Sequence, residues 1–194
     1  MPRRLSRKWS TIVIHHSATA NGGAKSFDAY HKEKRGWDGL GYHFVIGNGT
    51  DTLDGQVEVG ARWRQQKTGA HCKTPNNYYN EHGIGICLVG DFTKSRPTPK
   101  QMASLRKLTR FLTRTCGISP ARVTTHRNVT GGTACPGSNF HLDAFRNMLA
   151  KDPDPRASSA PALATAPDRS RSAGGSPSST QPYGFAHARA HRSH

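Results

Sequence analysis

The sequence lacks the features that would place it in a membrane or mark it for export. No apolar run approaches the ~20 residues that a membrane-spanning helix requires. After the charged start MPRRLSRKW, the apolar stretch from Thr11 to Ile14 is much shorter than a signal-peptide core of about 7–15 residues. We therefore expect no membrane span, and a protein that is cytoplasmic as synthesised.

Several common site motifs are also missing. No GxGxxG or GxxxxGK[ST] segment follows a predicted strand, so neither a dinucleotide-binding fold nor a P-loop is indicated. No CxxC pair is present, and the cysteines do not form a dense disulfide framework. One disulfide remains possible but is not implied by the positions of Cys72, Cys87, Cys116 and Cys135.

Acidic residues are scarce. The 194 residues include 12 Asp and Glu against 28 Lys and Arg, a formal net charge of +16. Residues 1–150 alone hold 22 Lys and Arg against 9 Asp and Glu. Such a charge attracts polyanions, among them nucleic acids and anionic bacterial walls. The alternative interpretation is a basic protein whose charge has no specific partner. The basic residues are scattered, without a recognisable nucleic-acid-binding module, so we expect no specific nucleic-acid partner.

Apolar residues are concentrated between about Trp9 and Leu149. Beyond that point the sequence consists mainly of Pro, Ser, Ala, Arg and Gly, a composition that offers little to bury. We predict a basic N-terminal arm over residues 1–9, one folded domain over 10–150 and a disordered tail over 151–194.

Hydrophobic periodicity and turn residues predict an α/β domain. Asn48-Gly49 is typical of a hairpin turn. The segment Gly83–Gly90 is apolar on both faces, which favours a central position in a sheet. Polar, irregular sequence over 62–82 and a Gly-rich stretch over 126–139 predict long loops. Strands are expected at Ser10–His15, Gly41–Ile46, Gly83–Gly90 and Arg122–Thr125, with a weaker strand pair within Thr50–Val59.

Three segments show helical periodicity. The clearest follows Thr98, which is the expected cap, with Pro99 at the first helical position, Gln101 completing a capping box and Gly117 as the stop. A second helix is expected over Ser26–Arg35, with Ser26 as its cap and Gly36 as its end, and a third over His141–Lys151 with Leu142, Phe145, Met148 and Leu149 facing inward. The predicted fold is a single α/β domain with a central mixed β-sheet flanked by about three helices.

Two segments far apart in the sequence carry potential metal ligands. IVIHHSAT over 12–19 places His15 at the end of a predicted strand, and THRNVTGGTACPGSNF over 125–140 does the same for His126, with Cys135 nine residues later. Two imidazoles and a thiolate suit Zn²⁺ and leave a fourth position for water, whose pKa zinc lowers to about 7. A lone His or Cys is more often an ordinary structural residue, so this set gains weight only through its context. His16 should point to the opposite face of the strand from His15.

Four stretches, in the same order, resemble the zinc amidase superfamily that contains phage N-acetylmuramoyl-L-alanine amidases and animal peptidoglycan recognition proteins. The resemblance extends over about 10–150, and four blocks in order are far more specific than any one block. These are IVIHHSAT (12–19), GWDGLGYHFVIGNGT (36–50), GAHCKTPNNYYNEHGIGICLVGDF (69–92) and THRNVTGGTACPG (125–137).

The resemblance implies a hydrolase that cleaves the amide bond between N-acetylmuramic acid and L-alanine in peptidoglycan. It implies one Zn²⁺ held by His15, His126 and Cys135. Tyr42 matches the family's active-site tyrosine, which orients water or assists proton transfer. Thr133 stands where phage enzymes often have lysine, and its hydroxyl would stabilise an oxyanion, with a smaller effect than a positive charge. Without the resemblance, Tyr42 would be read as an aromatic residue packed in a strand.

The resemblance also places His71 and Asn80 in the substrate groove, where they would bind the stem peptide or the glycan. The spacing from His126 to Cys135 is one residue longer than the family pattern, and Thr130-Gly131-Gly132 would absorb the extra residue. Arg62 and Arg64 are weaker candidates for contacts with stem-peptide carboxylates.

The alternative function is a peptidoglycan-binding receptor without catalysis, because some family members lack a zinc ligand and only bind. The presence of all three ligand candidates and of Tyr42 favours the enzyme. Expected partners are peptidoglycan or muropeptides and the anionic cell wall, and we expect a monomer. Both a phage-type endolysin released to the wall and a cytosolic recycling enzyme fit the missing signal peptide.

Overall fold

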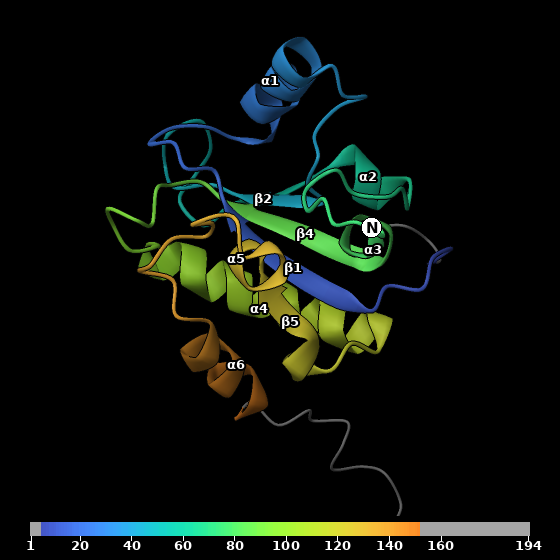
Figure 1. Cartoon of the computed structure of the whole chain (residues 1–194). Coiled ribbons are helices and arrows are strands. Elements are labelled where there is room, and N and C mark those ends of the chain that lie inside the picture. Colours follow the sequence, from blue (N-terminus) through green and yellow to red (C-terminus); the bar gives the residue numbers. More distant parts are fainter. Residues whose placement is uncertain (1–4, 152–194) are drawn as a thin grey trace, which may run out of the picture. The chain divides into compact units, whose positions relative to one another are not determined.

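The computed structural model describes residues 5–151; the first four residues of the predicted arm and nearly all of the predicted tail lie outside this range. Its centre is a five-stranded sheet with the strand order β3-β2-β4-β1-β5 (Figure 1). Strands β2, β4, β1 and β5 run parallel to one another, and β3 pairs antiparallel with β2. The sheet is therefore mixed, as predicted. The strands are β1 (Thr11–His16), β2 (Phe44–Ile46), β3 (Val57–Val59), β4 (Gly83–Leu88) and β5 (Val123–Thr125).

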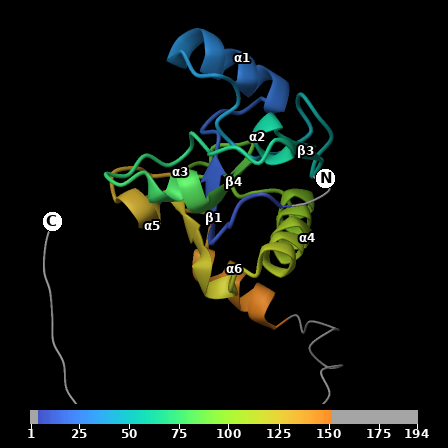
Figure 2. The ribbon, with the colours of Figure 1, turned by 90° about the vertical axis from the view of Figure 1, so that its right-hand side faces the viewer.

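Helices cover both faces of the sheet. In Figures 1 and 2, α4 and α6 lie on one side of the sheet and α1 lies on the other. Three longer helices on a mixed sheet confirm the predicted fold class. The helices are α1 (Ala24–Arg35), α2 (Ala61–Arg64), α3 (Tyr78–His82), α4 (Pro99–Cys116), the 3₁₀ turn η1 (Pro120–Arg122), α5 (His126–Thr130) and α6 (Leu142–Ala150).

The main core lies between the sheet and the helices α4 and α6. Alternate residues of β1 and β4, such as Ile12, Ile14 and Ile86, join Leu105 of α4 and Phe145 of α6 in this cluster, and all five are fully buried. Each such side chain stabilises the fold by about 1.5–3 kcal/mol through removal of apolar surface from water. Because side chains alternate along a strand, the residues between them face the other side of the sheet.

The ends of α4 follow the sequence signals. Thr98 Oγ1 accepts a hydrogen bond from the Gln101 amide at 3.0 Å, and Gln101 Oε1 accepts one from the Thr98 amide at 3.1 Å. The side-chain nitrogen Nε2 of Gln101 also donates to the carbonyl oxygens of Ile46 and Val89, which links the helix to the sheet. Gly117 ends the helix with φ = 67°, a left-handed conformation that glycine adopts without strain.

Other boundaries differ from the predictions. Helix α1 begins two residues earlier than expected and is preceded by Gly23, so Ser26 is not the cap; its hydroxyl instead accepts from the Gly23 amide. The predicted strand over 41–46 forms only at Phe44–Ile46, and the expected strand pair within 50–59 is the single strand β3. The predicted loops contain the short helices α2, α3 and α5. Met148 is 41% exposed and does not join the inward face of α6.

The structure also describes the end of the predicted arm and the helices that bear on the membrane prediction. Trp9, the last residue of the predicted arm, is buried, and its indole N–H donates to Gln66 Oε1. Between residues 5 and 151, none of the helices has the length and apolar character needed to cross a membrane.

Candidate metal centre and its cleft

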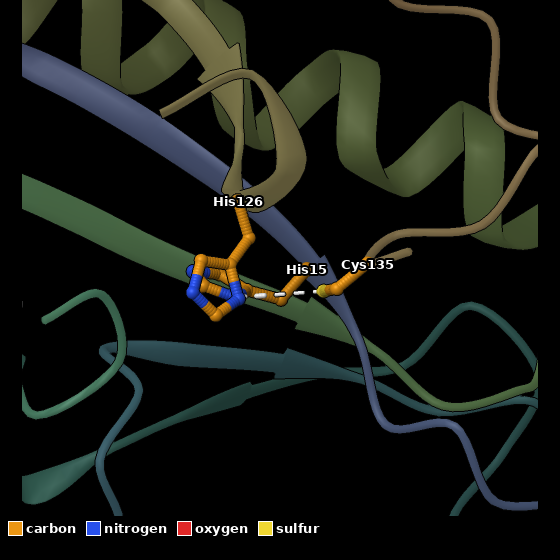
Figure 3. A group of neighbouring side chains, drawn as sticks. All are labelled: His15, His126 and Cys135. Carbon is orange, nitrogen blue, oxygen red and sulfur yellow. Dashed lines mark hydrogen bonds between the residues drawn. The ribbon is translucent and has the colours of Figure 1, made fainter. Parts of the chain in front are cut away.

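Three side chains from distant parts of the sequence meet beyond the carboxyl ends of two neighbouring parallel strands. His15 lies near the end of β1, on the side of the sheet opposite Ile12 and Ile14. Val123 of β5 faces the core, on the same side of the sheet as Ile12 and Ile14. His126 is three residues further along, and because successive side chains alternate between the two sides, it lies on the same side as His15. Cys135 comes from the loop after α5, and Figure 3 shows the three side chains pointing toward one another.

The separations suit one tetrahedral metal ion. One potential ligand atom from each of the three residues lies within 4.8 Å of the other two. Cys135 Sγ is 3.7 Å from His15 Nδ1. A tetrahedral zinc with Zn–S ≈ 2.3 Å and Zn–N ≈ 2.0–2.1 Å separates such a pair by about 3.6 Å. Two imidazoles and one thiol also form a donor set that zinc prefers, so the residues fit the metal that the resemblance implies.

The electrostatics of these groups follow from burial. Burial lowers the pKa of His15 well below its usual value, and the neighbouring His71 and His126 lower it further. Burial also lowers the pKa of His126, so both imidazoles are neutral and have a lone pair available for a metal. In the metal-free protein, burial raises the pKa of the Cys135 thiol to about 12, and metal binding would displace its proton.

Backbone contacts hold Cys135 in place. The Arg127 amide donates to the Cys135 carbonyl at 2.8 Å, which closes the loop between α5 and Cys135. Gly131 ends α5 in the left-handed region with φ = 68°, within the segment predicted to absorb the longer spacing. The His16 amide donates to Cys135 Sγ at 3.3 Å, a contact that favours the thiolate.

Tyr42 and Thr133 both lie beside the three ligand candidates. The Tyr42 ring centroid is 5.2 Å from that of His15, and Tyr42 stands just before β2 rather than within a strand. Burial and the nearby Cys87 and Cys135 raise the pKa of Tyr42 well above its usual value, so its hydroxyl stays protonated. Thr133 Oγ1 accepts a hydrogen bond from the Cys135 amide at 3.1 Å. A hydroxyl that accepts such a bond still has its own O–H to donate.

His71 and Asn80 line the same cleft, but their polar atoms also contact the protein. His71 Nδ1 lies 3.1 Å from His15 Nε2, and His71 Nε2 lies 3.3 Å from the Gly83 carbonyl oxygen. Asn80 Oδ1 accepts hydrogen bonds from the amides of His71 and Cys72, both at 2.8 Å. Their predicted contacts with substrate remain predictions.

The cleft around these residues has a volume of about 1140 Å³. Its wall includes residues of α1 and the turn after it that sequence reasoning did not assign to the site: Tyr30, His31, Arg35 and Trp37. Tyr30 is 49% exposed and Trp37 is 38% exposed, which is unusual for large aromatic side chains. Two aromatic residues and an arginine close together in sequence, Tyr30 and Arg35 on α1 and Trp37 just after it, are the signal that would have indicated this wall.

Three further residues, whose roles the sequence left open or indicated only weakly, form hydrogen bonds with other parts of the protein. His16 faces away from His15, as predicted, and its Nδ1 accepts a hydrogen bond from the Phe92 amide. His43 Nδ1 accepts from the Gly85 amide, and burial lowers the pKa of His43 to about 4. Arg62 is buried, donates to the carbonyls of Leu40 and Thr68, and pairs with Asp38, so it is occupied within the protein rather than open to a stem peptide.

Together, the α/β fold and a His-His-Cys group in a large open cleft define the class of candidate metal-dependent hydrolases. Comparison with known proteins specifies the family. The profile described as "N-acetylmuramoyl-L-alanine amidase" matches residues 5–138, and the chain belongs to this family.

Individual relatives agree with this assignment. The endolysin of Escherichia phage T7 is 36% identical over 146 residues, which cover 71% of this chain and 87% of the phage protein. An N-acetylmuramoyl-L-alanine amidase of the pig, Sus scrofa, is 28% identical over 159 residues, which cover 76% of this chain. The match spans only 24% of the longer pig protein.

Solved structures show the same fold. The N-acetylmuramoyl-L-alanine amidase LysC from Clostridium intestinale superposes with a TM-score of 0.64 at 32% identity, covering 77% of this chain and 91% of LysC. Insect peptidoglycan recognition proteins are also similar to the chain in sequence and in structure.

Proposed function

We propose that this protein is a zinc-dependent amidase that hydrolyses the bond between the lactyl group of N-acetylmuramic acid and L-alanine in peptidoglycan. The observation that carries the proposal is the meeting of His15, His126 and Cys135, with their ligand atoms within 4.8 Å, in an open cleft. Three protein ligands leave one tetrahedral position open, as in catalytic rather than structural zinc sites. Zinc held there would supply Lewis acidity and lower the pKa of water to about 7.

The neighbouring side chains provide the remaining functions of an amide hydrolase. In the proposed reaction, water adds to the carbonyl carbon, the C–N bond breaks, and the amine of L-alanine leaves after accepting a proton. Tyr42, which stays protonated, orients the attacking water through its hydroxyl and assists proton transfer. Thr133 donates its O–H to the oxyanion of the tetrahedral intermediate.

The cleft offers a surface for an extended substrate. Tyr30 and Trp37 present partly exposed rings in its wall, and the Arg35 guanidinium lies 5.8 Å above the Tyr30 ring. Aromatic rings provide large, rigid contact area, and a guanidinium matches the geometry of a carboxylate. We propose that this wall contacts the sugar and the stem peptide. The excess of basic residues would favour approach to an anionic cell wall.

A recognition protein without catalysis is the second candidate, because insect peptidoglycan recognition proteins are similar to this chain. The two candidate functions differ in whether they require the metal ligands. A receptor needs the cleft but not an intact His-His-Cys set, whereas this chain has all three donors together with Tyr42. We therefore favour hydrolysis.

The experiment is digestion of purified sacculi, with mass spectrometry of the released stem peptides. The wild-type protein should release peptides with a free L-alanine amino terminus and should contain one zinc per chain by elemental analysis. His126→Ala and Cys135→Ala should reduce release to background, because each leaves the metal only two of its ligands. Cys116→Ala is the matched control, because Cys116 lies on α4, across the sheet, and should leave release unchanged.

The outcomes separate the two candidates. Binding of the wild-type protein to sacculi without peptide release would support the receptor. Activity that survives in both ligand variants, or after thorough metal removal, would refute the zinc mechanism.

A further inference from the structure

The two ring nitrogens of His15 have different neighbours. Nδ1 faces Cys135 Sγ at 3.7 Å and is the nitrogen on the side of the candidate metal. Nε2 faces away from the thiol, toward Nδ1 of His71, at 3.1 Å. A histidine that binds a metal through one nitrogen usually donates the N–H of the other to a partner, which determines the tautomer and the ring orientation.

The direction of these hydrogen bonds follows from the carbonyl oxygen of Gly83, the last group in the series from His15 through His71. His71 Nε2 lies 3.3 Å from the carbonyl oxygen of Gly83, and a carbonyl oxygen only accepts. In a neutral imidazole the proton therefore sits on His71 Nε2, and His71 Nδ1 is an acceptor. His15 Nε2–H donates to that acceptor, which leaves the lone pair of His15 on Nδ1, where the metal would lie.

The backbone at two glycines lies close against the His71 ring. A Cβ atom on Gly85 would lie 2.5 Å from His71 Cδ2, and one on Gly69 would also overlap the ring. Gly85 is on the face of β4 that looks toward the cleft, opposite the core residues Ile84 and Ile86. The absence of side chains at both glycines therefore leaves a slot that the imidazole fills.

The backbone at His71 is held as well. Asn80 Oδ1 accepts from the amides of His71 and Cys72, and Asn80 Nδ2 donates to Asn77 Oδ1 at 2.8 Å. The side chain of Asn80 is thus oriented with its oxygen toward residue 71. The backbone of two glycines and the side chain of Asn80 thus hold His71 in a position where its Nδ1 faces His15.

We infer that His71 is a positioning residue for the metal: it holds His15 in the tautomer whose Nδ1 can bind zinc. This role differs from the substrate contact expected from sequence, and it rests on the proposed zinc centre. His71 itself would not touch the ion, so its effect should appear in metal affinity before any substrate is present.

The test is zinc affinity by competition with a chromogenic chelator, at one pH and without substrate. His71→Ala removes the acceptor and should weaken zinc binding by about 10- to 100-fold, the usual effect of losing a partner of a metal ligand. His71→Asn places an amide oxygen near the position of Nδ1 and should restore affinity close to wild type. His141→Ala, an exposed histidine before α6, is the matched control and should bind zinc like the wild type.

A second comparison covers the case in which His71→Ala does not fold. His71→Gln extends the amide by one methylene toward Gly83 and does not place an acceptor at the Nδ1 position, so it should bind zinc more weakly than His71→Asn. The visible spectrum of the Co²⁺-substituted protein should change in the Gln variant and be preserved in the Asn variant.

Three results are decisive. Unchanged zinc affinity in His71→Ala or His71→Gln, with only KM raised, would overturn the inference in favour of a substrate contact. Equal losses in the Asn and Gln variants would overturn it too, because the acceptor would then make no difference. Failure of the wild-type protein to bind zinc would instead refute the proposed function itself.

Discussion

His15 and His16 are neighbours in sequence with opposite surroundings. The alternation of side chains along β1 sends His15 to the cleft and His16 toward Phe92 in the core. The same alternation places His126 beside His15, because β1 and β5 are adjacent parallel strands in register. Strand geometry therefore accounts for two of the three ligand candidates, and the loop after α5 supplies the third.

Tyr42→Phe should separate chemistry from metal binding. The substitution removes only the hydroxyl, which we propose assists proton transfer, so kcat on soluble muropeptide should fall by about 10²-fold or more. Zinc content should stay at one per chain, because the ring beside His15 remains. Steady-state kinetics and elemental analysis measure the two effects. Tyr78→Phe is the matched control, since its hydroxyl contacts Ser10 and lies outside the cleft. An undiminished kcat in Tyr42→Phe would remove Tyr42 from the mechanism.

Sequence motifs predicted which residues would gather at the site, but not all of their contacts. The meeting of His15, His126 and Cys135 follows from strand ends and the family pattern. The contact between His71 and His15 depends on the path of the long connection before β4, and no local signal specifies that path. The burial of Arg62 was missed for the same reason, because its carbonyl partners Leu40 and Thr68 belong to loops.

At the scale of elements, α4 was predicted accurately because its signals are local. Thr98, Pro99, Gln101 and Gly117 act within one turn of the helix ends, so their effect does not depend on the rest of the fold. Helix α5 has a local cap too, since Thr125 Oγ1 accepts from the Asn128 amide, but five residues are too few for a periodic pattern. Strand β2 was predicted too long because apolar character does not report where pairing with β4 begins.

The cap of α4 gives a prediction about stability alone. Thr98→Ala removes the bond to the Gln101 amide and the bond to Asp54 Oδ1, and should lower the free energy of unfolding by about 1 kcal/mol. Urea unfolding followed by circular dichroism measures the change. Thr115→Ala, an exposed position near the other end of α4, should have little effect. Because α4 lies across the sheet from the cleft, the amidase activity of Thr98→Ala at 25 °C should be unchanged. If Thr98→Ala and the wild type had equal free energies of unfolding, the cap would contribute nothing to stability.

At the scale of the whole molecule, metal binding and folding should be coupled. The three ligand candidates come from β1, α5 and a loop, so the complete set exists only in the folded chain. Free zinc at 100 times its Kd should stabilise the protein by about 2.7 kcal/mol, which raises Tm by on the order of 5–10 °C for a domain of this size. Differential scanning calorimetry with and without a chelator measures the shift. Cys135→Ala should abolish most of it, whereas Cys116→Ala should preserve it; a Tm independent of zinc in the wild type would argue against a bound ion.

Within residues 5–151 the structure describes a five-stranded sheet, its hydrophobic core and a cleft lined by residues from His15 to Cys135. We therefore propose residues 10–150 as the catalytic unit and expect a protein truncated after Lys151 to fold, bind one zinc and cleave soluble muropeptide with an unchanged kcat/KM. Residues 1–150 also hold 22 Lys and Arg against 9 Asp and Glu, so the truncated protein should still bind intact walls, and added salt should weaken that binding. Cosedimentation with sacculi across a salt series measures the binding, with the full chain as reference. If the truncated protein lost kcat/KM on the soluble substrate, residues after 151 would have to contribute to the site, and the proposed boundary would be wrong.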